Sequence, residues 1–114
     1  MRLINLRNHQ IIARELFSAH SFWKRSVGLL GRKSMAEGSG LWINPCRGIH
    51  TCFMKFPIDA IFVDDELRVR SVRRNLRPWR MVPYVWRAAS VIELPAGTVL
   101  PGSVQKGDQL HVAD

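Results

Sequence analysis

The sequence has few cysteines and no long hydrophobic run. Only Cys46 and Cys52 are present among 114 residues, and a reducing cytosol keeps such thiols unpaired. No apolar run approaches the ~18 residues that a membrane helix needs. The first residues mix apolar with polar side chains, so they lack the core of a signal peptide. These absences argue against a disulfide scaffold and predict a cytoplasmic protein without a membrane span.

Acidic residues are missing from one long stretch of the chain. Between Leu67 and Ile92 there are seven arginines and no Asp or Glu, so this stretch carries +7 of the net charge of +8. The seven are Arg68, Arg70, Arg73, Arg74, Arg77, Arg80 and Arg87. Such a stripe attracts phosphates, acidic protein surfaces or anionic lipid head groups. The alternative is a solvated strand face that keeps a sheet edge from pairing with other chains.

The length and the hydrophobic pattern predict one mainly-β domain over residues 1–114. A chain of this size is usual for a single domain, and it contains no repeat or low-complexity tract. Short β-rich runs separated by turn residues favour a sandwich or a partly closed barrel. These runs cover residues 3–6, 11–17, 41–43, 49–54, 58–63, 67–72, 90–94 and 109–112.

Two segments depart from the β pattern. Near residues 22–31, Phe22, Trp23 and Val27 recur at roughly helical spacing after a capping serine, which predicts one short α-helix. Residues 75–87 contain two prolines among several large aromatic side chains, and they predict a long ordered loop packed on the body. Long ordered loops often carry function.

Several ordered motifs are shared with a known family. They are GLLGR at 28–32, PCRGIHT at 45–51, FMKFPIDAIFVD at 53–64, ELPAG at 93–97 and GD at 107–108. Through them the chain resembles domain-of-unknown-function family 192, over about residues 10–113. The resemblance implies a compact mainly-β domain of sandwich or jelly-roll type. It implies no established activity, and it supplies no catalytic residue.

The densest cluster of reactive side chains lies between residues 46 and 59. If residues 49–54 form a strand, His50, Cys52 and Met54 share one face, and such ligands suit a soft ion such as copper(I). The spacing matches no standard zinc pattern, and buried Cys and Met are ordinary core residues. The sequence therefore predicts no dedicated metal site and no cofactor.

The same cluster also raises an enzymatic alternative. Cys46 or Cys52 could act as a nucleophile with His50 as its base and Asp59 as the group that orients the base, as in a small hydrolase or transferase. Nothing in the sequence marks an oxyanion hole. A plainer role for Asp59 is to accept hydrogen bonds from loop amides or to meet an arginine.

Arginines near tryptophan suggest a binding surface instead. Guanidinium groups bind carboxylates and phosphates bidentately, and tryptophan faces stack on planar groups. The candidate binding residues are Arg32, Arg47, His50, Thr51, Met54, Arg73, Arg74, Trp79 and Arg80. No nucleic-acid motif is present, so nucleic acid is one candidate partner among several. We predict a non-enzymatic binding or accessory module for an anionic protein or small molecule, with the Cys46/His50/Asp59 enzyme or soft-metal carrier as the alternative.

Overall fold

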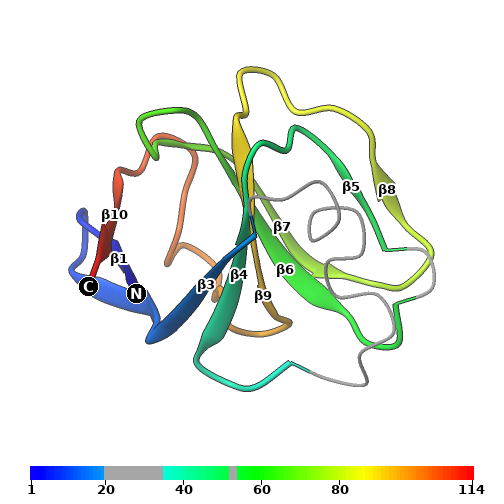
Figure 1. Ribbon diagram of the computed structural model, residues 1–114, viewed down its shortest axis with the longest axis horizontal. Coiled ribbons are helices and arrows are strands. Elements are labelled where there is room, and N and C mark those ends of the chain that lie inside the picture. Colours follow the sequence, from blue (N-terminus) through cyan, green and yellow to red (C-terminus); the bar gives the residue numbers. More distant parts are fainter. Residues whose placement is uncertain (20–34, 52–53) are drawn as a thin grey trace.

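The computed structural model describes residues 1–19, 35–51 and 54–114, and within them the chain forms ten strands and no helix (Figure 1). The strands are β1 (Arg2–Asn5), β2 (Gln10–Ala13), β3 (Glu15–Ala19), β4 (Ser39–Ile43), β5 (Ile49–His50), β6 (Ile58–Val63), β7 (Val69–Leu76), β8 (Met81–Val82), β9 (Ser90–Pro95) and β10 (Leu110–Ala113). The mainly-β prediction is confirmed. The helix predicted near residues 22–31 lies outside the described residues and is not confirmed.

Three sheets build the fold. The largest has the order β3-β4-β9-β6-β7, in which β3 runs parallel to β4 and the other pairs are antiparallel. A three-stranded sheet has the order β10-β1-β2, and β5 pairs with β8. An isolated bridge from Arg68 to Gln109 connects the start of β7 with the C-terminal segment, but no ladder continues it. The described residues form several sheets and no closed barrel.

The central strands β6 and β9 are buried on both faces. On one face Ile61 and Leu94 pack in a cluster that includes Leu3 and Leu110 of the three-stranded sheet. On the other face Phe62 and its neighbours pack against the segments around β5 and β8. Burial of apolar surface on both sides explains why these strands read as nearly continuous hydrophobic runs.

The structure splits the run predicted over residues 11–17. Residues up to Ala13 stay paired with β1, whereas Glu15 begins the edge strand of the large sheet. The chain bends at Arg14, where the amides of Arg14 and Glu15 both donate to the carbonyl of Gly38. One apolar run therefore serves two sheets.

Among the described residues, the strand predicted over residues 49–54 is confirmed only at Ile49–His50. Thr51 and Met54 belong to no strand, and the amide of Met54 donates to the carbonyl of Thr51 over 3.1 Å. His50 is exposed and Met54 is buried, which means that they do not share a strand face. Cys52, the third member of the predicted face, lies outside the described residues.

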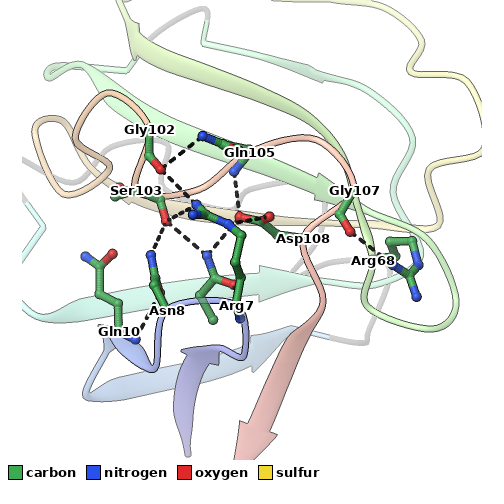
Figure 2. A network of polar contacts seen from close by, with 10 residues as sticks. Arg7, Asn8, Gln10, Arg68, Gly102, Ser103, Gln105, Gly107 and Asp108 are labelled. Atoms are coloured by element: carbon green, nitrogen blue, oxygen red, sulfur yellow. Dashed lines mark hydrogen bonds and ion pairs between the residues drawn. The ribbon is translucent and has the colours of Figure 1, made fainter.

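A buried carboxylate joins the first hairpin to the C-terminal turn (Figure 2). Asp108 accepts hydrogen bonds from Arg7 Nε at 2.8 Å, Asn5 Nδ2 at 2.9 Å and the amide of Gln105 at 2.8 Å. Burial alone would raise the pKa of Asp108, but the hydrogen bonds from Arg7, Asn5 and Gln105 outweigh it and lower that pKa below its usual value. The three-stranded sheet is thus fixed to residues 102–108 by charge-assisted contacts.

No helix among the described residues has the length and apolar character needed to cross a bilayer.

Candidate functional site

Four arginines and two aromatic rings line one open cleft of about 810 Å³, which we call the arginine cleft. It lies between the turn that joins β6 to β7 and the loop that precedes β9. Its lining residues are Arg47, Asp64, Asp65, Glu66, Arg68, Arg70, Tyr84, Trp86, Arg87, Ala88 and Ala89. Its volume falls in the range of small-molecule sites.

A β-bulge directs Arg70 to the cleft. Phe62 pairs with Ser71 and the next residue, Val63, pairs with Val69, so Arg70 is the extra residue of β7. Bulges of this kind change the direction in which a side chain points. Arg70 Nε is buried and has no hydrogen-bond partner among the described residues. A buried donor without a partner costs about 1–3 kcal/mol, so the fold leaves part of the hydrogen-bonding capacity of Arg70 unused.

The loop that precedes β9 forms the other wall of the arginine cleft, and backbone hydrogen bonds fix it at two places. The amide of Val85 donates to the carbonyl of Arg47, and the amide of Ala89 donates to the carbonyl of Val63, both over 2.8 Å. Between these contacts Arg87 has a φ of 61°, and its Cζ lies 5.8 Å from the centroid of the Trp86 ring. A left-handed backbone at a residue other than glycine costs about 1–2 kcal/mol. The fold therefore holds Arg87 and Trp86 in one defined arrangement at the cleft.

The arginines of the cleft are not neutralised by the acids beside them. The described residues contain one ion pair, Arg7 with Asp108, which lies elsewhere. In the cleft, Asp64 Oδ1 accepts the backbone amides of Glu66 and Arg68 at 2.9 Å and so closes the β6–β7 turn. The guanidinium groups thus keep their capacity to bind an anion.

The structure separates the predicted binding residues into several places. Arg47 lies in the arginine cleft. Arg73 and Arg74 are exposed on β7, an edge strand, where they also fit the role of discouraging edge pairing. Trp79 and Arg80 are exposed on a separate turn. Arg32 lies outside the described residues.

Thr51 and Met54 are buried side chains, whereas His50 is exposed. Thr51 Oγ1 accepts from the amide of Arg80 at 2.8 Å and donates to the carbonyl of Arg77. Met54 packs against Ile58. Thr51 therefore positions a loop.

Sequence reasoning did not select Arg68, Arg70 or Arg87 as site residues, although it identified the arginine-rich stretch that contains them. It also did not select Tyr84 and Trp86. The signal that could have found them is their position next to the turn residues 64–66 and the prolines of the loop. The bulge at Arg70 has no local sequence signature, because it arises from pairing with β6.

Asp59 and Cys46, two residues of the enzymatic alternative, lie on different faces of the large sheet. Asp59 pairs with Leu94, which packs on one face of the large sheet, whereas Cys46 packs on the other face beside Phe62. Asp59 Oδ1 accepts from the amide of Asn75 at 2.7 Å, and its Oδ2 accepts from two amides of the turn after β9. This confirms its role as an acceptor for loop amides.

The contacts described for Cys46 require neither a metal ion nor a catalytic role. Cys46 Sγ donates to the carbonyl of Gly48 at 2.9 Å. Across residues 1–19, 35–51 and 54–114, no group of three or more His, Cys, Asp or Glu side chains is placed to hold a metal ion. Cys52, the other candidate nucleophile and ligand, lies outside these ranges.

Comparison with known proteins places the chain in a family. The family model DUF192, described as "Uncharacterized ACR", matches residues 4–112. The chain belongs to the DUF192 family. Two similar proteins are named UPF0127 proteins: one from Pyrococcus horikoshii is 35% identical over 101 residues, covering 84% of this chain and 85% of that protein. One from Pyrococcus furiosus is 29% identical and covers 96% of each chain.

A solved structure shares the fold of this DUF192 chain. A protein of unknown function from Novosphingobium aromaticivorans superposes with a TM-score of 0.81 at 19% identity, covering 97% of this chain and 82% of that one. At this identity the likeness concerns the fold alone. No activity comes with the family, so function has to be argued from the site.

Proposed function

We propose that this DUF192 protein is a non-enzymatic binding module that holds a small anionic molecule in the arginine cleft. The observation that carries the proposal is the cluster of four arginines in one cleft, where the Nε of Arg70 has no hydrogen-bond partner among the described residues. A phosphate or carboxylate oxygen can accept hydrogen bonds from the guanidinium groups of these arginines. The predicted cytoplasmic location would offer many small molecules that carry such groups.

The size and the rings of the cleft favour a small molecule over a protein. The volume of about 810 Å³ lies in the range of small-molecule sites, which are roughly 300–1,000 Å³. Tyr84 and Trp86 can cover the apolar part of such a ligand while the arginines bind its charge.

The acids at the rim narrow the choice of ligand further. Asp65 and Glu66 are exposed in the turn that borders the cleft. A long polyanion such as nucleic acid would have to pass these carboxylates, and like charges repel. A compact ligand with one or two anionic groups avoids that repulsion.

The enzymatic and soft-metal alternatives at Cys46, His50 and Asp59 have no supporting contact among the described residues. The carboxylate of Asp59 is used by three backbone amides, and His50 is exposed. We therefore put forward binding alone.

Titration with inorganic phosphate, pyrophosphate and malonate, followed by calorimetry and amide chemical shifts, tests the proposal. We expect binding that weakens as salt rises, and an Arg70→Gln change should lower the affinity at least tenfold, because one charge-assisted contact contributes about 1.5–3 kcal/mol. Arg2→Gln, an exposed arginine outside the cleft, is the matched control. Equal affinities for the wild type and R70Q would contradict the proposal.

An Arg87→Gly variant separates binding from stability. Glycine accepts a φ of 61° without strain, so the free energy of unfolding should stay level or rise by up to about 1 kcal/mol. Anion affinity should fall because a guanidinium group is lost. A variant that is at least as stable as the wild type and still binds as tightly would remove Arg87 from the site.

A further inference from the structure

A second surface lies apart from the arginine cleft, at the turn formed by residues 77–81, which we call the tryptophan turn. Trp79 is 59% exposed and Met81 is 67% exposed. The arginines of this turn, Arg77 and Arg80, are exposed beside them. Large apolar side chains and cations thus occur together on five consecutive residues.

Buried Thr51 holds this turn in one conformation. Thr51 is 0% exposed, and its amide donates to the carbonyl of Arg80 at 2.8 Å while its carbonyl accepts from the amide of Trp79 at 3.1 Å. Its hydroxyl adds the contacts to Arg77 and Arg80 described above. The turn is therefore ordered in advance, which lowers the entropy cost of docking.

The backbone at Trp79 is left-handed, with a φ of 64°. Tryptophan is a poor residue for that conformation, which favours glycine and asparagine. The fold thus holds a bulky ring in an unfavourable backbone conformation and still leaves more than half of it exposed. Backbone outliers of this kind are concentrated at functional sites.

We propose that the tryptophan turn docks on the surface of an anionic lipid bilayer. Tryptophan partitions to the level of the lipid head groups, Met81 adds apolar contact, and arginine side chains are drawn to anionic lipids. The stretch from Leu67 to Ile92 contains no acid, so nothing in it opposes that attraction. Charge complementarity thus selects an anionic surface.

The shape of the turn favours a bilayer over a protein partner. Five residues present far less than the roughly 800 Å² that a stable protein interface needs. A bilayer surface accepts a small protruding turn without a matching pocket. Strand β8, which begins in this turn, lies in Figure 1 on the side of the molecule opposite the two chain ends, at its outer edge.

Sedimentation with vesicles tests the proposal on the full chain. We expect binding to equimolar phosphatidylcholine and phosphatidylglycerol at low salt and none to phosphatidylcholine alone. The double variant Trp79→Asn, Met81→Ser should bind at least tenfold more weakly, because it removes the apolar contact while asparagine still accepts the left-handed backbone. Replacing Arg77 and Arg80 by glutamine should reduce binding about fivefold for each arginine.

The chain offers a matched control in Phe17, which is also 59% exposed but lies on β3, at the opposite edge of the large sheet from β7. Phe17→Ser should bind vesicles like the wild type. R70Q should also bind vesicles normally, so failure of the cleft proposal would leave this result unchanged.

Three results would overturn the bilayer proposal. The first is a lack of binding to the phosphatidylglycerol vesicles. The second is equal vesicle binding by the wild type and the W79N/M81S variant. The third is Trp79-dependent binding to soluble polyglutamate without binding to vesicles, which would assign the turn to an acidic protein.

Discussion

A buried carboxyl group lies on the central sheet, away from both surfaces proposed above. Glu93 is 5% exposed, and in the ladders it is opposite Leu41 on one side and Ala60 on the other. Its Oε2 has no hydrogen-bond partner in the part of the chain that the structure describes, and burial raises its pKa to about 7. The protonated form of this side chain is therefore the one that the fold favours.

This carboxyl makes stability depend on pH. The pKa of Glu93 rises from 4.5 in the unfolded chain to about 7 in the fold. Its contribution to the free energy of unfolding is therefore fully present below pH 4.5 and is lost as the pH rises through about 7. The loss is on the order of 3 kcal/mol. Glu93→Gln should flatten the slope of unfolding free energy against pH in this window, as measured by urea unfolding.

Glu37, an exposed glutamate, provides the control for that experiment. Glu37→Gln should leave the slope as it is in the wild type. A Glu93→Gln variant with the wild-type slope would show that the side chain ionises in the fold at an ordinary pH. The β-rich run at 90–94 did not reveal this burial, because a strand covered on both faces can hold a polar residue at any position.

At the scale of elements, Asp59 connects β6 with two other segments. Its carboxylate accepts the amide of Asn75, whose φ is 54°, and the amides of Gly97 and Val99 in the turn after β9. Asp59→Ala would leave these donors without their acceptor. We expect a loss of about 3 kcal/mol or more in unfolding free energy.

Hydrogen exchange checks the same variant at the three amides concerned. Their exchange should accelerate in D59A more than exchange in β1 or β10. Asp65→Ala, an exposed acid in the β6–β7 turn, is the matched control and should change neither measurement. Unchanged protection of Asn75 and Val99 in D59A would contradict the assigned role.

At the scale of elements, the local hydrophobic pattern predicted strands correctly where one run of residues forms one strand. The runs at 58–63 and 90–94 became β6 and β9, because apolar continuity marks strands that are covered on both sides. The local pattern failed to predict strand boundaries that are set by contacts with residues far away in the sequence. The bend at Arg14 depends on Gly38, and the end of β5 depends on the hydrogen bonds of Thr51 with Trp79 and Arg80. The arginine-rich stretch was visible in the sequence, but which arginines gather in one cleft depends on the bulge at Arg70.

At the scale of the whole molecule, the contacts of Asp108 join segments from the two ends of the chain (Figure 2). The lowered pKa of this carboxyl means that its stabilising contribution is present above the ordinary value of 3.8 and is lost as the pH falls through the lowered value. Asp108→Asn should reduce the unfolding free energy at neutral pH by about 2 kcal/mol.

The difference between D108N and the wild type should shrink in acid, where the wild-type carboxyl also becomes neutral. Urea unfolding of both proteins at several pH values, from neutral to acid, measures this difference. Asp114→Asn, an exposed acid at the end of the chain, is the control. A difference that is constant from neutral pH to strong acid would mean that charge is not the origin of the effect.

The pairing of β1 with β10 places Arg2 opposite Ala113, so the first and last strands are hydrogen-bonded neighbours (Figure 1). Such a pair has almost the largest separation along the chain that this protein allows, and the loop-closure entropy of bringing it together grows with that separation. Contacts of high contact order slow folding. The two ends are therefore expected to meet late, after β6 and β9 have formed the nucleus onto which they close.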